Sequence, residues 1–234
     1  MPLIETINLT KAYSLQPVLK KLNLSIDAGE FVALLGANGS GKSTLLRMLS
    51  GLSRPTAGVI RIGGWELPRE VESVRAQIGV VGHKPLLYET LTARENLRFF
   101  ARLYNVPFDD AVLHASLTRV GLAKRADDLV RGFSRGMQQR LSIARALLHK
   151  PDVLIFDEPY TGLDQNGSTA LDDLLRSAHA DGHTIIMATH DLDRAAGLAS
   201  RAVILARGVL SKDQPMDGID GVALSALYQH TAGA

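Results

Sequence analysis

The feature that most restricts the fold is a glycine-rich segment, residues 36–44, between an apolar run and a helix-forming run. It reads Gly-Ala-Asn-Gly-Ser-Gly-Lys-Ser-Thr and fits the pattern G-x-x-x-x-G-K-[ST]. Residues 31–35 before it are all apolar, as in a strand buried on both faces, and residues 42–49 after it are predicted to be helical. A strand, a tight loop and a helix in this order predict an α/β fold whose loop binds phosphate groups through backbone N–H groups.

Two side chains of this loop suit the triphosphate of a nucleotide. Lys42 provides a positive charge for the terminal phosphates, and one such contact at 4 Å is worth about 4 kcal/mol near a protein surface. The Ser43 hydroxyl is an oxygen ligand for Mg²⁺. An ordinary glycine-rich turn would need neither the flanking elements nor the Lys-Ser pair. The residues predicted to bind nucleotide are Gly36, Ala37, Asn38, Gly39, Ser40, Gly41, Lys42, Ser43 and Thr44.

Composition limits the remaining classes of protein. The chain has 234 residues, 46% hydrophobic and 21% charged, which is ordinary for one large or two small globular domains. Its 26 Lys and Arg nearly balance its 24 Asp and Glu, so no nucleic-acid partner is expected. The absence of cysteine excludes disulfides and thiolate metal sites. No apolar run reaches the about 20 residues of a membrane span, and the N-terminus does not read as a signal peptide.

A second buried strand carries acidic groups at its end. Residues 153–156 are continuously apolar and are followed by Asp157 and Glu158. Ligands bind at the carboxyl ends of strands in α/β sheets, so both carboxylates are expected at the phosphate site. Asp157 is predicted to hold Mg²⁺ through its water, and Glu158 to orient and deprotonate an attacking water. The alternative, a surface turn capped by two acids, would not normally follow four apolar residues.

Hydrophobic periodicity predicts a mixed arrangement around these motifs. The first third of the chain is expected to form short strands at a sheet edge, the middle helices, and the last third alternating strands and helices. The middle helices form an insertion near residues 85–145, and its first helix begins at the capping box Thr92-Ala93-Arg94-Glu95. The other expected elements are strands 3–9, 22–26, 31–35, 59–62, 153–157 and 184–189, a hairpin over 202–210, and helices 42–49, 109–120, 137–148, 168–180 and 222–229.

Further motifs resemble those of the ATP-binding-cassette (ABC) ATPases over nearly the whole chain. Residues 133–140, Phe-Ser-Arg-Gly-Met-Gln-Gln-Arg, resemble the ABC signature, which other phosphate-loop ATPases lack. Residues 160–164 resemble the D-loop, and residues 189–191 resemble the switch-histidine motif. Tyr13 stands where the family places an aromatic residue under adenine, and stacking there discriminates weakly among bases. Together with the phosphate loop and the strand that ends in Asp157 and Glu158, these motifs make six elements. They follow one another in the order found in the family.

The resemblance implies a fold class and a division of the chain. The fold class is α/β, a phosphate-loop NTPase cassette of ABC type with a mixed β-sheet core, a helical subdomain and an N-terminal antiparallel β region. The nucleotide-binding domain would cover residues 1–212, with the helical subdomain inserted at about 85–145. Residues 213–234 would form a C-terminal tail.

The resemblance also implies roles for individual residues. Glu158, His190 and Lys42 would be the catalytic residues, with His190 hydrogen-bonding the γ-phosphate and the attacking water. Ser134 and the N–H of Gly136 open a helix and would bind an anion there. That anion would be the γ-phosphate held by a second cassette.

Two departures from the family pattern affect these expectations. His83 occupies the position of the family's glutamine near Mg²⁺, and it is counted with Ser43 and Asp157 as a candidate for the metal site. Arg135 and Met137 replace the commoner glycine and glutamine of the signature. The serine and the second glycine that contact the anion remain, so binding is expected to survive with altered strength.

Within the family, residues 83–85 and 91–97 resemble the ATP-binding subunits of cytochrome c maturation haem exporters. Residues 158–161 are shared with that group and with drug and polysaccharide exporters. The expected function is MgATP hydrolysis that drives export, with haem as the candidate cargo. The alternatives are a multidrug or polysaccharide-type exporter, a non-transport ABC protein of translation or DNA repair, and a module that only binds nucleotide.

The resemblance implies partners as well as cofactors. ATP and Mg²⁺ are the expected cofactors, and a second cassette, identical or homologous, would complete a head-to-tail dimer. A transmembrane permease subunit is the expected membrane partner, which would hold the chain peripherally at the cytoplasmic face of the cell (inner) membrane. Residues 84–88 are the expected contact with a cytoplasmic helix of that subunit.

Overall fold

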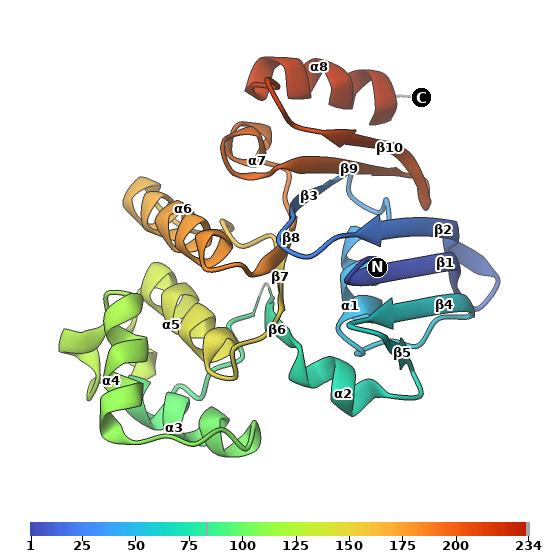
Figure 1. Ribbon diagram of the computed structural model, residues 1–234. Helices are drawn as coiled ribbons and strands as arrows, with labels where there is room; N and C mark the ends of the chain where they lie inside the picture. Colours follow the sequence, from blue (N-terminus) through green and yellow to red (C-terminus); the bar gives the residue numbers. More distant parts are fainter. Residues whose placement is uncertain (83, 233–234) are drawn as a thin grey trace.

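A computed structural model describes residues 1–82 and 84–232 and contains two β-sheets flanked by helices (Figure 1). The first sheet is antiparallel, with strand order β2-β1-β4-β5. Its strands are β1 (Ile4–Tyr13), β2 (Gln16–Ile26), β4 (Ala57–Ile62) and β5 (Trp65–Leu67). The strands predicted at 3–9, 22–26 and 59–62 are confirmed, but the β1–β2 hairpin is longer because pairing continues through polar residues to Tyr13 and Gln16.

The second sheet has six strands in the order β10-β9-β3-β8-β7-β6. All neighbours are parallel except the β9–β10 hairpin. Its strands are β3 (Phe31–Leu35), β6 (Ile78–Val81), β7 (Val153–Asp157), β8 (Thr184–Ala188), β9 (Arg201–Ala206) and β10 (Val209–Pro215). Strands β3 and β8 are buried throughout, as their continuous apolar sequences predicted for a sheet covered on both faces.

Alternate residues of β3 belong to two separate cores. Val32 and Leu34 pack with α1 (Lys42–Leu49) and the antiparallel sheet, whereas Phe31, Ala33 and Leu35 pack with the helices on the opposite face. Those helices are α5 (Arg135–Leu147), α6 (Gln165–Ala180), α7 (Leu192–Leu198) and α8 (Gly221–Ala232). The six-stranded sheet is therefore the central layer, and the phosphate-loop sequence leaves it between β3 and α1.

The helical insertion forms a core of its own beside the sheet (Figure 1). It contains α3 (Ala93–Leu103), α4 (Asp110–Arg119), two short 3₁₀ turns (Ala123–Arg125 and Val130–Gly132) and α5. The predicted capping box is present, because Thr92 accepts from the Glu95 N–H and the Glu95 carboxylate accepts from the Thr92 N–H. Helix α5 belongs both to this core and to the core over the sheet, so it connects the insertion to the sheet.

Some elements escaped the sequence analysis. Helix α2 (Val71–Ala76) and strand β5 were not expected, because each is short and only one of its residues is buried. Helix α7 was also missed, and it begins where Asp191 accepts a hydrogen bond from the Arg194 N–H. Helix α6 starts three residues before the predicted position because Asp164 caps it.

Strand β10 and helix α8 pack against the central sheet and its helices. Strand β10 crosses the predicted boundary at residue 212, and Met216 and Leu224 are buried with α6 and α7. The division into residues 1–212 and 213–234 stays a prediction. In the part of the chain that the structure describes, no helix has the length and apolar character needed to cross a bilayer.

Candidate functional site

The loop between β3 and α1 requires glycine at its two bends. Gly36 and Gly41 have φ angles of +151° and +110°, a region that L side chains rarely adopt. A Cβ on Gly36 would lie 2.4 Å from the Leu205 carbonyl oxygen, and one on Gly41 would lie 2.6 Å from the Leu19 side chain. The loop therefore lies close to β2 and β9 at these two positions, and only glycine fits there.

Lys42 is directed back over this loop. Its Nζ donates to the carbonyl oxygens of Gly36 at 2.6 Å and Ala37 at 3.4 Å, and the residue is only 7% exposed. Burial lowers the pKa of Lys42, while the nearby charges of Glu158 and Asp157 raise it. The ammonium therefore sits among acceptors that phosphate oxygens can replace.

Two oxygen groups suited to a hard cation meet beside the loop. The Ser43 hydroxyl donates to Asp157 Oδ1 at 3.1 Å, across 114 residues of sequence. Mg²⁺ prefers such oxygen ligands and commonly keeps only one or two from protein, with phosphates and waters completing the octahedron. Ser40 Oγ is buried in the same loop and has no hydrogen-bond partner among the described residues, and an incoming phosphate oxygen would supply one. The residues present fit a nucleotide with Mg²⁺. His83 lies outside the described residues.

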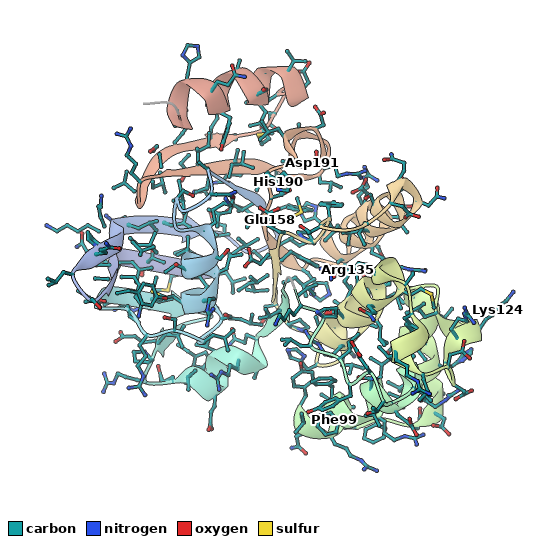
Figure 2. All side chains as sticks on the ribbon, turned by 180° about the vertical axis from the view of Figure 1, so that it is seen from behind. Phe99, Lys124, Arg135, Glu158, His190 and Asp191 are labelled. Atoms are coloured by element: carbon teal, nitrogen blue, oxygen red, sulfur yellow. The ribbon has the colours of Figure 1, made fainter. Side chains whose placement is uncertain are left out.

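Glu158 has an unusual backbone. Its φ is +52°, a left-handed conformation that costs of the order of 1–3 kcal/mol for a residue other than glycine. Its N–H donates to the Ala188 carbonyl at 2.9 Å, which ties the end of β7 to the end of β8. Glu158 Oε2 is 2.7 Å from His190 Nδ1, and Figure 2 shows the two side chains together. The strained turn therefore points the carboxylate toward the switch-histidine segment.

The signature segment is at the N-terminus of α5. Ser134 caps that helix by accepting from the Met137 N–H at 3.3 Å. An open cavity of about 390 Å³ lies beside it, and Arg135, labelled in Figure 2, is part of its wall. The lining residues are Ser134, Arg135, Gly136, Arg140, Gly162, Asp164, Asn166, Gly167 and Ala170. None of them belongs to residues 36–44, so the Ser134 cavity and the phosphate loop are separate surfaces of one chain.

The family model described as ABC transporter matches residues 19–161. The chain belongs to the ABC transporter family. It is an ABC transporter ATPase, and ATP is the nucleotide of its cassette.

Curated ABC relatives include several transport proteins. The linearmycin resistance ATP-binding protein of Bacillus subtilis is 36% identical over 208 residues, covering 88% of this chain and 67% of that protein. The Nod factor export ATP-binding protein I of Rhizobium meliloti is 39% identical, covering 88% and 62%. The bacitracin transport ATP-binding protein of Bacillus licheniformis is 38% identical, covering 92% and 70%.

Solved ABC structures share the fold. A dimeric ATP-binding cassette in a post-hydrolysis state, bound to ADP and Pi, matches with a TM-score of 0.83 at 30% identity, covering 92% of this chain and 100% of that one. An ATP-binding subunit of an ABC transporter matches with a TM-score of 0.85 at 32% identity, covering 97% and 99%. The predicted fold class is confirmed.

The relatives do not support the haem-exporter interpretation. They are resistance, Nod factor and bacitracin proteins, which agrees better with the alternative of a drug or polysaccharide-type exporter. The haem interpretation depended on short segments around residues 83–97, whereas the relatives match about nine-tenths of the chain.

Tyr13 of this ABC cassette lies at the end of β1, in the antiparallel sheet. The residue is 51% exposed, and Lys11 Nζ is 4.8 Å from the ring centroid. An exposed face beside a cation is compatible with a stacking partner, and the adenine role stays a prediction.

The structure brings together polar groups that the sequence analysis did not connect. Tyr160 Oη donates to Asp172 Oδ1 at 2.6 Å, and Arg194 Nη1 donates to Asp172 Oδ2 at 2.5 Å. Asp172 and Arg194 are on two different helices, so spacing along the chain gave no signal for this contact. The hydrogen bond between Glu158 and His190 was likewise not expected, although each residue had been selected separately.

Proposed function

We propose that this chain hydrolyses MgATP as the energy-supplying subunit of an ABC exporter of the class that includes resistance, Nod factor and bacitracin transporters. The observation that carries the proposal is the single site formed by Lys42, Ser43, Asp157 and Glu158, which come from two segments over 100 residues apart. Such a set matches what phosphoryl transfer needs, namely a cation for the phosphates, a metal-ligand pair and a base.

In this proposal each residue has a separate task. Lys42 exchanges its carbonyl partners for phosphate oxygens and stabilises the negative charge on the transferred group. Ser43 and Asp157 would hold Mg²⁺, which when bound supplies further positive charge to the phosphates. Glu158 accepts a proton from the attacking water. His190, hydrogen-bonded to Glu158, orients that carboxylate from the end of β8.

A second cassette completes the site in this proposal. Ser134 and the Gly136 N–H border a cavity that contains no residue of this chain's phosphate loop. Two copies related by a two-fold axis would place each Ser134 over the Lys42 loop of the other copy. Two solved structures of one related cassette are described as dimeric, and this supports the arrangement. ATP bound between the copies would favour the closed state because both copies contact its terminal phosphate.

The membrane partner would dock on the insertion. Leu86 and Tyr88 are 60% and 49% exposed, and a hollow of about 320 Å³ beside them is lined in part by Lys84, Pro85 and Leu87. An amphipathic helix at the cytoplasmic end of a permease has the apolar surface that such a hollow accepts. This partner would hold the chain at the cytoplasmic face of the membrane.

Replacement of the proposed base tests the catalytic part. Glu158→Gln should bind ATP with parental affinity but release phosphate at least about 100-fold more slowly, since positioned proton transfer contributes 10²–10⁴-fold. Glu72→Gln, an exposed carboxylate on α2, is the matched control and should hydrolyse at the parental rate. Parental turnover in Glu158→Gln would contradict the proposal.

Co-expression with its membrane subunit in a sensitive host tests the export class. The parental pair should raise tolerance to bacitracin or linearmycin, and the pair containing Glu158→Gln should not. Equal tolerance from the two pairs would contradict coupling of hydrolysis to export of such compounds.

A further inference from the structure

A polar cluster includes residues that closely follow Glu158 and His190 in the chain. It contains Tyr160, Asp172 on α6, and Asp191 and Arg194 at the start of α7. Asp172 accepts from the Tyr160 hydroxyl at 2.6 Å with one oxygen and pairs with Arg194 at 2.5 Å with the other. Arg194 Nε is also 3.2 Å from Asp191 Oδ2, and the guanidinium lies over the Tyr160 ring, 4.9 Å from its centroid.

The Asp172–Arg194 pair of this cluster is partly buried and less exposed than an ordinary surface ion pair. The side chains of Arg194 and Asp172 are 18% and 14% exposed, whereas the neighbouring pair of Arg176 and Asp173 on α6 is 56% and 73% exposed. Burial raises the pKa of Tyr160, and the hydrogen bond to Asp172 raises it further, so the hydroxyl remains a donor at physiological pH. Removing one member would leave a partly buried charge without its partner.

The cluster is joined by the chain to both groups at the reaction centre. Tyr160 is two residues after Glu158, and Asp191 directly follows His190. Figure 2 labels Glu158, His190 and Asp191. Asp191 also caps α7 and accepts from the Arg194 N–H at 3.1 Å. The backbone of Glu158 is in the left-handed region, so neighbouring contacts must hold it there. Arg194 and Asp172 connect the Glu158 turn to the His190 turn through side-chain contacts with Tyr160 and Asp191, in addition to the backbone hydrogen bond from the Glu158 N–H to the Ala188 carbonyl.

We propose that Asp172 and Arg194 are positioning residues that fix the Glu158 turn relative to the His190 turn, acting through Tyr160 and Asp191. The inference rests on the proposed role of Glu158 as base. In this proposal Asp172 and Arg194 set the distance between Glu158 Oε2 and His190 Nδ1. They thereby set the direction of the Glu158 carboxylate. A misplacement of about 1 Å can lower a rate by as much as 100-fold while substrate binding is retained.

Steady-state kinetics of conservative variants test the proposal. Tyr160→Phe removes only the hydroxyl, and Arg194→Lys keeps the charge but cannot reach both carboxylates in the same way. Each should lower kcat at least fivefold while KM for ATP changes less than twofold. Asp173→Asn, one residue from Asp172 but exposed, is the control and should keep parental kcat and KM.

Two further measurements separate positioning from a merely structural role. Each rate is divided by the fraction of folded protein, which is measured by nucleotide binding. If a variant only lowers stability, its corrected kcat equals that of the parent, and this result would overturn the proposal. In a Glu158→Gln background, Tyr160→Phe should cause no further loss in single-turnover hydrolysis, because residues that act through one group are not additive. A further fivefold loss there would overturn the proposal.

The same data distinguish failure of the inference from failure of the proposed function. If Glu158→Gln is inactive and Tyr160→Phe and Arg194→Lys keep parental kcat, the positioning role is wrong and the base assignment stands. If Glu158→Gln hydrolyses ATP at the parental rate, the base assignment itself is wrong, and the positioning role falls with it.

Discussion

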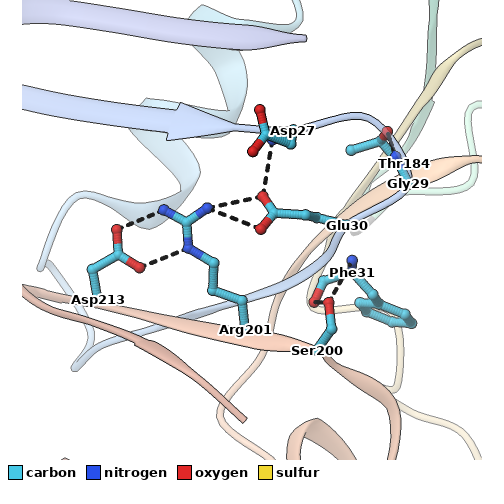
Figure 3. Close-up of polar contacts among 8 residues, drawn as sticks. All are labelled: Asp27, Gly29, Glu30, Phe31, Thr184, Ser200, Arg201 and Asp213. Carbon is cyan, nitrogen blue, oxygen red and sulfur yellow. Dashed lines mark hydrogen bonds and ion pairs between the residues drawn. The ribbon is translucent and has the colours of Figure 1, made fainter. Parts of the chain in front are cut away.

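Arg201 at the start of β9 allows a quantitative test of how the sheet edge is held (Figure 3). Its guanidinium forms two parallel hydrogen bonds to Asp213 of β10, both 2.7 Å, and contacts Glu30 before β3 at 2.8 Å and 3.2 Å. The hydrogen bond to Asp213 raises the pKa of Arg201, with Glu30 adding to the rise, so the group is charged at every physiological pH. The perturbation is Arg201→Met, which keeps much of the aliphatic stem.

The magnitude follows from the burial of the cluster. Breaking a fully buried pair costs about 3–5 kcal/mol, whereas an exposed pair is worth about 0–1 kcal/mol. The Arg201 side chain is 18% exposed and its partners are 26% and 33% exposed, so an intermediate loss of about 2 kcal/mol is expected. For a domain of this size that corresponds to a fall in Tm of about 4–8 °C.

Urea unfolding of the parent and the variant measures this loss. Arg61→Met is the matched control, because Arg61 also contacts two carboxylates, those of Glu5 and Glu66, but is 46% exposed. It should cost at most about 1 kcal/mol. Equal losses in the two variants would refute the reasoning that burial and bidentate geometry make the Arg201 cluster the stronger one.

Two other predictions concern charge in buried surroundings. Lys42→Ala should weaken ATP binding by at least about tenfold, as a charge-assisted contact is worth about 1.5–3 kcal/mol, and calorimetry showing unchanged affinity would contradict its phosphate role. Burial lowers the pKa of His149 below 6.5, against the hydrogen bond to the Ile78 carbonyl. The unfolded state therefore binds the proton on His149 more readily than the folded state does. The contribution of neutral His149 to the free energy of unfolding is complete above pH 6.5 and is lost as the pH falls. His149→Gln should reduce the drop in unfolding free energy between pH 7.5 and pH 5.5, and an undiminished drop would exclude His149 as its source.

Elements with a strong local signal were predictable from the sequence. The strands β3, β7 and β8 are mainly apolar runs, and Thr92 and Glu95 predict the cap of α3. The phosphate loop and the two acids at the end of β7, Asp157 and Glu158, could be placed at one sheet edge because parallel strands present their carboxyl ends together.

Long-range side-chain pairing could not be predicted in the same way. The contacts of Asp172 with Tyr160 and Arg194 depend on how α6 and α7 pack, and no periodicity encodes that geometry. The packing of α8 on the sheet also depends on a few buried side chains, such as Leu224, in a sequence with weak amphipathic character. The sequence therefore predicted that α8 is a helix but did not predict its part in the core.

In the proposed dimer, one ATP is held by the Lys42 loop of one copy and the Ser134 turn of another. Because the chain has no cysteine, single cysteines can be introduced at Asn38 and Arg135, both exposed, in two differently tagged copies carrying Glu158→Gln. A short bis-maleimide should join the two copies when ATP and Mg²⁺ are present and should join few without nucleotide. Absence of the mixed product under every nucleotide condition would contradict the account.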